Sequence, residues 1–308
     1  HSWSILNGRT VEEDVTSAYV MANLNMELGD IPVTGNVGLR VVRTEQRAFG
    51  LSNVGGGAGE PIADDRGVIN SDFIRVEEGV DFTDYLPSFN LNFQLTDSDQ
   101  LRLAYAKVLS RPDLSQMGIR NTWRWEVGTE FGNVINLDSS TTPTVLPFYA
   151  DQIDLSYEHY FTETDGAVTV AIFNKDIENF PVTVTTENFD YSLIGLEIPE
   201  TPEIDRVDPA TGEDIIYQPF GTYSRLVNVG DAGYIRGIEF AYTQTFTNLP
   251  DLWKGLGVNL NFSYTESDIE RPSNVPGEEG TSAPLEGLSE RVWTATVFYD
   301  YDDIFEVR

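Results

Sequence analysis

Apolar and polar residues alternate almost without interruption between residues 85 and 95. One set of alternate positions is apolar (Pro87, Phe89, Leu91, Phe93 and Leu95), and the other set is polar (Ser88, Asn90, Asn92 and Gln94). A period of two is typical of a β-strand with one apolar and one polar face. The polar run at 96–100 is rich in turn-forming residues, and the alternation resumes at Leu101, Leu103 and Tyr105. Two such runs joined by so short a link predict an antiparallel hairpin.

The same pattern predicts β-strands along the rest of the chain. Further hairpins and strands are predicted over 10–45, 148–180, 233–246, 258–265 and 290–308, and the strand that enters the first hairpin is expected to begin near 76–82. Between them lie four long stretches without clear alternation, at 50–72, 112–147, 181–227 and 266–287. The short connections centre on residues 30, 98, 164, 251 and 302, the last within DYDD (300–303). Short and long connections therefore alternate along the whole chain.

This alternation of loop lengths favours an antiparallel transmembrane β-barrel with short periplasmic turns and long extracellular loops. Aromatic residues also gather beside the short turns, as expected of a girdle at a membrane interface: Phe93, Tyr160, Phe161, Phe246, Trp253, Tyr299, Tyr301 and Phe305. A soluble β-rich binding module, with the same aromatics closing its core, is the alternative. About ten strands are predicted, and a sheet with open edges is not stable in lipid. The chain is therefore expected to be a segment of a larger barrel.

Composition narrows the function further. The chain has 308 residues, with 50 acidic and 19 basic side chains and a net charge of -31, so nucleic acid is not an expected partner. There is no cysteine and there are only two histidines, and no spacing singles out a nucleophile or an acid/base pair, so an enzyme is not expected. No cofactor is predicted. Acidic stretches at 97–100 and 201–214 lack the regular loop of a calcium motif, so metal binding is left open.

The hairpin sequence YLPSFNLNFQLTDSDQLRLAYAKVLSRPDLSQM, residues 85–117, resembles a hairpin found in TonB-dependent outer-membrane receptors. Four further segments are similar to the same family in the same order: TVEEDVTSAYVMANLNMEL, YADQIDLSYEHYF with FNKDIENF, NVGDAGYIRGIEFAYTQTF, and LGVNLNFSYTES. Together they extend along nearly the whole chain. Within the family, the chain is most similar to the large branch that is often linked to glycan uptake.

The resemblance implies a 22-stranded barrel in the outer membrane of a Gram-negative bacterium. It also implies an N-terminal plug domain and coupling to the inner-membrane TonB complex. No plug, coupling box, early barrel strands or terminal aromatic strand is recognised, so residues 1–308 are expected to be a middle-to-late part of one barrel domain. The implied partners are outer-membrane lipid and the TonB complex, the latter through N-terminal parts not present in this sequence; a surface lipoprotein is left open.

The expected activity is active import of a bulky nutrient, with an oligosaccharide as the first substrate class and a ferric siderophore as the alternative. Strong negative charge would repel anionic siderophores, which favours a neutral ligand. Exposed aromatic rings in long loops can stack on a sugar face, although such residues also pin loops to their neighbours. The predicted ligand-binding residues are Trp123, Trp125, Tyr149, Tyr191 and Tyr217.

Overall fold

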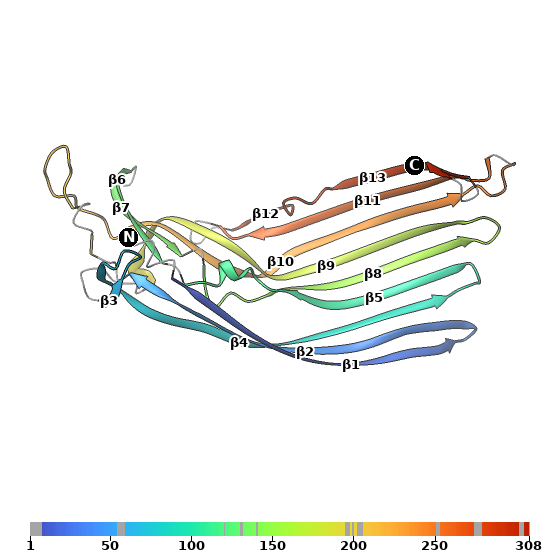
Figure 1. Ribbon diagram of the computed structural model, residues 1–308, viewed down its shortest axis with the longest axis horizontal. Helices are drawn as coiled ribbons and strands as arrows, with labels where there is room; N and C mark the ends of the chain where they lie inside the picture. The colour runs from blue at the N-terminus through green and yellow to red at the C-terminus, as the bar shows by residue number, and fades with distance from the viewer. Residues whose placement is uncertain are drawn as a thin grey trace.

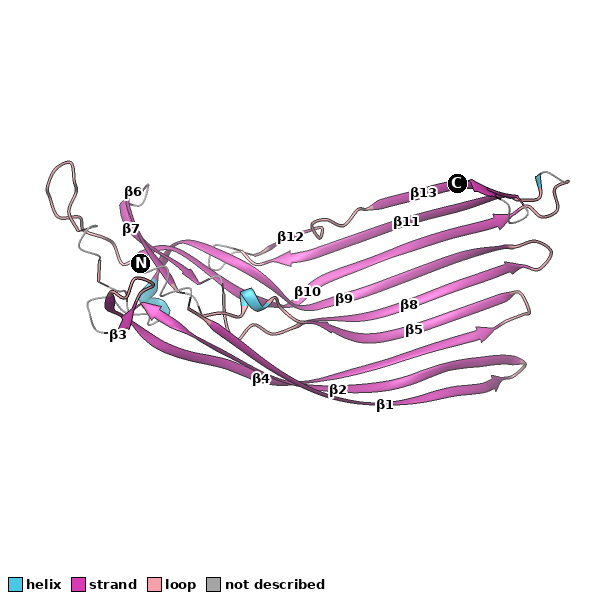
Figure 2. Cartoon of the chain, in the orientation of Figure 1, coloured by secondary structure: helices cyan, strands magenta, loops and turns pink. Residues whose placement is uncertain are grey.

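The computed structural model is a single antiparallel β-sheet that carries smaller strands and loops at one end (Figures 1 and 2). It describes residues 8–307 except 54–58, 120, 130–131, 140, 195–197, 199, 202–205, 251–252, 274–278 and 302–304. Ten strands follow one another across the sheet: β1 (Thr10–Leu28), β2 (Ile31–Asn53), β4 (Ile69–Gln94), β5 (Asp99–Ser110), β8 (Phe148–Phe161), β9 (Gly166–Asp190), β10 (Phe220–Thr245), β11 (Leu256–Arg271), β13 (Arg291–Tyr301) and β14 (Phe305–Val307). The sheet is open, with β1 and β14 at its two edges.

Four short strands and two short helices complete the described part of the chain. They are β3 (Glu60–Ala63), β6 (Thr122–Thr129), β7 (Gly132–Ser139), β12 (Thr281–Ala283) and the 3-10 helices η1 (Leu114–Gln116) and η2 (Tyr191–Ile194). β3 pairs with β4, β12 with β11, and β6 with β7. Within the described residues, neither helix has the length or the apolar character needed to cross a membrane.

The predicted hairpins are confirmed. Their turns at 29–30, 95–98 and 162–165, and the ends of β10 and β11 at Thr245 and Leu256, all lie at one end of the sheet, which we call the turn end, and the longer connections lie at the other, the loop end (Figure 1). Gly29 adopts a φ of +66°, a left-handed conformation that favours glycine in a two-residue turn. The predicted turn at DYDD includes residues 302–304, which lie outside the described residues.

The predicted strand boundaries at the loop end were wrong. β4 begins at Ile69 rather than near residue 76, because its ladder with β2 continues from Val33↔Phe93 up to Asn53↔Phe73, and its first residues pair with β3 as far as Ala63↔Ile69. β9 likewise runs on to Asp190, and the 112–147 stretch contains β6, β7 and η1. Backbone hydrogen bonds extend these ladders beyond the point where apolar and polar side chains alternate, so side-chain periodicity misses them.

The two faces of the sheet differ in chemistry because the register aligns residues of like polarity across neighbouring strands. One row on the apolar face passes through Gly35, Leu91, Leu103, Leu155, Ile172, Ile238 and Tyr264. The next row passes through Val33, Phe93, Leu101, Tyr157, Val170, Phe240, Phe262 and Trp293. Many of these side chains are open to the surroundings, and Ile172 is 49% exposed. The apolar residues form a continuous, uncovered band.

The opposite face carries polar rows between the apolar ones. One of them passes through Thr34, Asn92, Arg102, Ser156, Ala171, Glu239 and Ser263. Side chains bond to one another on this face, as between Asn90 and Asn36 at 3.4 Å and between Arg102 Nε and Glu158 at 2.8 Å. Hydrophilic groups on one face and an apolar band on the other are the pattern of a barrel wall between water and lipid.

The apolar band also has suitable dimensions. It extends from Pro87 of β4 to Leu95, the residue after the end of the strand, which at about 3.3 Å per residue is about 26 Å. A strand tilted by about 40° would then cross about 20 Å of hydrocarbon, close to the height of the apolar band in outer-membrane barrels. On the same face, just beyond the band towards the loop end, charged pairs begin, such as Arg236 with Glu266 at 3.0 Å.

Candidate ligand-binding region at the loop end

The β6–β7 hairpin is attached to the exposed edge of β10. β11 pairs with β10 only as far as Gly233, and beyond that point β7 pairs with β10 in parallel, Tyr223 facing Leu137. The approach is close: a Cβ atom on Gly221 would lie 2.2 Å from the carbonyl oxygen of Ile135. Only glycine permits this contact, so the local sequence specifies where the hairpin docks.

An aromatic cluster fills the junction between the hairpin and β9–β10. Its buried members are Trp123, Ile135, Leu137, Phe189 and Tyr191. The rings of Trp123 and Tyr191 meet edge to face with centroids 5.2 Å apart. The Tyr191 hydroxyl lies 2.7 Å from the carbonyl oxygen of Ile135 and 3.0 Å from that of Thr222, so it can donate to either. Burial raises the pKa of this hydroxyl, because the phenolate would lose its solvation.

Four of the five predicted binding residues come together here. Trp123 is 8% exposed and Tyr191 is fully buried, so their ring faces are covered by protein. Trp125 and Tyr217 are half-buried and pack against the same cluster, and the indole N–H of Trp125 has no hydrogen-bond partner among the residues that the structure describes. Tyr149 lies apart on β8 and donates to Asp84 on β4 at 2.7 Å. The cluster positions the loop, and only its half-buried rim is accessible.

A loop segment crosses the polar face of the sheet at the loop end; we call residues 141–147 the strap. The Gln46 side chain of β2, which is 1% exposed, donates to the carbonyl oxygen of Pro143 at 2.5 Å. At the other side, Asn228 of β10 accepts from the Leu146 backbone N–H and donates to its carbonyl oxygen, both at 3.0 Å. β2 and β10 are separated in the sheet by four strands. The strap therefore spans the polar face rather than following the edge of the sheet.

The strap is also held by apolar contacts and by the segment that follows β5. Met117 and Val145, each 1% exposed, pack with Leu226 of β10 and with Val11 of β1. Thr142 donates from its backbone N–H to the Gln116 carbonyl oxygen at 2.8 Å. Helix η1 begins with a capping box formed by Asp113 and Gln116, and the backbone and side-chain hydrogen bonds of Ser115 lower the pKa of Asp113. Sequence periodicity gave no signal for this arrangement, because the contacts that hold the strap to β2, to β10 and to Gln116 join residues distant in the chain.

Replacing Asn228 by alanine is expected to release one side of the strap. Three hydrogen bonds disappear, to Leu146 N–H, Leu146 C=O and the Asn179 carbonyl oxygen, which should cost about 1–3 kcal/mol of local stability. Hydrogen exchange of amides 141–147 in the full-length receptor should accelerate. Asn261→Ala, on the same face but distant from the strap, is the control. Equal exchange in both variants would contradict the bonding described here.

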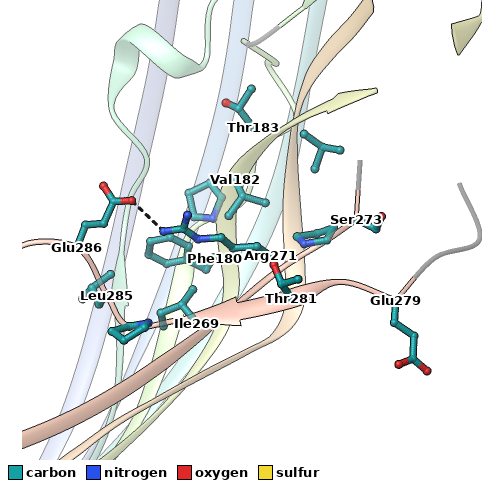
Figure 3. Close-up of a pocket in the computed structure, with 14 residues that line it drawn as sticks. Phe180, Val182, Thr183, Ile269, Arg271, Ser273, Glu279, Thr281, Leu285 and Glu286 are labelled. Atoms are coloured by element: carbon teal, nitrogen blue, oxygen red, sulfur yellow. Dashed lines mark hydrogen bonds and ion pairs between the residues drawn. The ribbon is translucent and has the colours of Figure 1, made fainter. Parts of the chain in front are cut away.

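A pocket lies beside the extension of β9 (Figure 3). It has a volume of about 820 Å³, in the range of pockets for small molecules. Phe180 and Val182 of β9 and Ile269 of β11 give it an apolar wall, and Arg271 points towards Glu286 across it at 2.9 Å. It combines a broad apolar surface with a few polar groups. Within the described ranges, no three His, Asp or Glu side chains are placed to hold a metal ion.

A wide antiparallel sheet with an uncovered apolar band on one face and polar rows on the other defines the chain as the wall of a membrane β-barrel. The family described as TonB dependent receptor-like, beta-barrel, matches residues 4–306. The chain belongs to this family, whose members are receptors rather than enzymes. A search among curated proteins gave no match.

Solved structures with similar folds cover most of this chain. The siderophore receptor PirA from Acinetobacter baumannii is 14% identical with a TM-score of 0.50, and the match covers 95% of this chain and 41% of PirA. The FrpB iron transporter from Neisseria meningitidis is 14% identical, TM-score 0.45, covering 96% and 31%. A variant of the ferric enterobactin receptor PfeA from Pseudomonas aeruginosa is 16% identical, TM-score 0.48, covering 95% and 40%. The chain thus spans less than half the length of each, and at this identity the likeness concerns the fold.

Proposed function

We propose that the chain forms part of the wall of a receptor in the outer membrane of a Gram-negative bacterium, and that this receptor imports a bulky nutrient with energy supplied through TonB. The observation that carries the proposal is the uncovered apolar band across the sheet, with Ile172 at its centre. In water such a surface would be a site of aggregation, whereas in a barrel wall it meets lipid. The polar face, with the strap, then faces the interior.

The proposal includes a 22-stranded barrel, of which residues 1–308 supply a middle-to-late part. Family membership supports it, as do the two open edges of the sheet, whose backbone groups need further strands as partners in lipid. Coupling to TonB and gating by a plug would use segments outside this sequence. With the turn end in the periplasm, the strap, the aromatic cluster and the large pocket all lie on the extracellular side.

For the ligand, we favour a ferric siderophore over an oligosaccharide. The solved relative PirA is described as a siderophore receptor. In addition, the ring faces of Trp123 and Tyr191, which would stack on sugars, are covered by protein. A net charge of -31 favours a ferric complex that is neutral or positive, because an anionic complex would be repelled. Trp125 and Tyr217, at the rim of the aromatic cluster, remain the predicted residues best placed to touch a ligand.

The test is equilibrium binding of the purified full-length receptor to a panel of ferric siderophores of different charge and of oligosaccharides. Binding of a neutral or cationic ferric complex is expected. Phe180→Ala, which removes an apolar wall of the large pocket, should weaken that binding by about tenfold or more. Phe246→Ala, next to β10 at the turn end, is the control. Selective binding of an oligosaccharide would restore the first substrate class predicted from the sequence.

The alternative of a soluble or surface binding module without transport makes a different physical prediction. Such a protein would stay in solution without detergent, whereas a barrel wall with this apolar band requires detergent or lipid. Partitioning of the full-length protein into the membrane fraction, and its extraction by detergent only, are expected.

A further inference from the structure

A second cavity lies on the polar face, on the turn-end side of the strap. Its volume is about 520 Å³, and it is formed by β1, β2, β4 and β5. Val15, Val42, Leu86 and Val108 provide an apolar surface, and the cationic residues Arg40, Lys107 and Arg111 also line the cavity. In the register, these valines and Leu86 belong to the polar-face set of positions, so the cavity opens on the side away from the apolar band.

The cavity exists because two neighbouring strands separate. β4 and β5 pair only from Gln94↔Gln100 to Ser88↔Ala106. The next residue of β4 is Pro87, whose nitrogen carries no hydrogen and cannot donate to a ladder. Beyond it β4 continues to pair with β2, and β5 with β8, while the two strands diverge (Figure 1). The space between them is the notch in which the cavity lies.

The notch carries positively charged side chains, whereas the chain as a whole is acidic. Acidic residues outnumber basic ones by 50 to 19. Nevertheless Arg40 is exposed at the cavity and makes no hydrogen bond or ion pair with any residue that the structure describes. Arg111 and Lys107 are already engaged: Arg111 Nη1 lies 3.1 Å from Glu13 Oε2, and Lys107 Nζ lies 2.9 Å from Asp151 and 3.1 Å from Glu178. Among the described residues, one guanidinium therefore has no partner and lies next to an apolar surface.

We propose that this cavity binds a small amphipathic carboxylate. The apolar body of such a molecule would lie on Val42, Leu86 and Val108, and its carboxylate would accept two parallel hydrogen bonds from Arg40. Guanidinium and carboxylate match in geometry, and the bidentate pair is among the stronger polar contacts. The volume is sufficient for a substituted aromatic acid. The inference depends on the polar face lying away from lipid, but not on which nutrient the receptor imports.

The experiment uses the full-length receptor in detergent and the probe 4-(trifluoromethyl)benzoate, observed by fluorine NMR. The neutral 4-(trifluoromethyl)benzamide has nearly the same shape and reports uptake by micelles. Saturable binding of the benzoate is expected, with the benzamide weaker by about tenfold or more, since the charge-assisted contact is lost. Arg40→Gln should remove the difference in affinity between benzoate and benzamide. Arg40→Lys should retain part of that difference, because the lysine ammonium keeps the charge but cannot form the two parallel hydrogen bonds of the guanidinium.

Arg43→Gln is the matched control. Arg43 lies three residues along β2, on the opposite face, and its Nη2 lies 2.9 Å from Glu45 Oε1, so its loss should leave benzoate binding unchanged. The inference is overturned if benzoate and benzamide bind the wild-type receptor alike, or if Arg40→Gln and Arg43→Gln have equal effects. Either result would leave the proposal of nutrient import untouched, because import is measured with the ferric siderophores alone.

Discussion

Replacing Ile172 by arginine is expected to destabilise the full-length receptor in lipid bilayers by about 2–4 kcal/mol. Ile172 lies in the middle of the apolar band, between Leu155 of β8 and Ile238 of β10 in the register, and is 49% exposed. If that exposed surface faces hydrocarbon, a guanidinium placed there has neither water nor a carboxylate partner. The measurement is reversible unfolding by denaturant in phospholipid vesicles.

The control is arginine at the adjacent position. Ala171 points to the polar face, where its register neighbours are Ser156 and Glu239, so Ala171→Arg places the charge in water beside a carboxylate. Its effect should be smaller than about 1 kcal/mol, as for a solvated surface pair. Both substitutions add the same side chain one residue apart on the same strand. If Ala171→Arg costs as much as Ile172→Arg, or more, the apolar face does not meet lipid and the barrel proposal is wrong.

Much of the sheet could be predicted from the sequence because its strands have faces of opposite polarity. The alternation around Phe89 and Asn90 reflects that contrast directly, and so do the hairpin turns at Gly29 and Thr96. Periodicity fails at the loop end, where β4 and β9 bury single side chains such as Phe73 and Phe189 in local clusters instead of presenting one apolar and one polar face. There the length of a strand depends on backbone pairing with the adjacent strand, as between Asn53 and Phe73. The pattern of side chains along one strand does not contain that information.

The candidate site was less predictable for a related reason. The composition of the 112–147 stretch marks Trp123 and Trp125 as notable, but burial of Trp123 depends on Tyr191, 68 residues later, and on the fit of Gly221 against Ile135. The strap likewise depends on Gln46 and Asn228, two amides in otherwise ordinary strands. Such residues differ from their neighbours only in what they contact. The Arg40 cavity lies where β4 and β5 stop pairing, next to Pro87, and the sequence alone does not show which strand would lie beside this proline.

The second large effect that we expect is a local loss of stability at the loop end. Tyr191→Ala is expected to release the β6–β7 hairpin from β10 without unfolding the sheet. Tyr191 is fully buried and touches the rings of Trp123, Phe189 and Tyr223. Removing a buried aromatic ring costs about 3–5 kcal/mol, because the cavity left behind closes only in part. Apart from the aromatic cluster, the hairpin is held by a short parallel pairing with β10 over Tyr223–Arg225 and by a few hydrogen bonds, such as that from the Thr222 N–H to Asn136 Oδ1 at 2.7 Å.

Hydrogen exchange resolves this local effect from global unfolding. In Tyr191→Ala, amides 122–129 and 132–138 should exchange far faster than in the wild type, while those in the hairpin β8–β9 near the turn end should not change. Tyr191→Phe keeps the ring and removes only the hydroxyl, leaving the Ile135 and Thr222 carbonyl oxygens without that donor, so a smaller loss of about 1–3 kcal/mol is expected. Leu193→Ala, two residues away and 75% exposed, should be neutral. Equal protection of the hairpin in Tyr191→Ala and Leu193→Ala would mean that the aromatic cluster does not hold it, and that Trp123 and Tyr191 are free to serve a ligand.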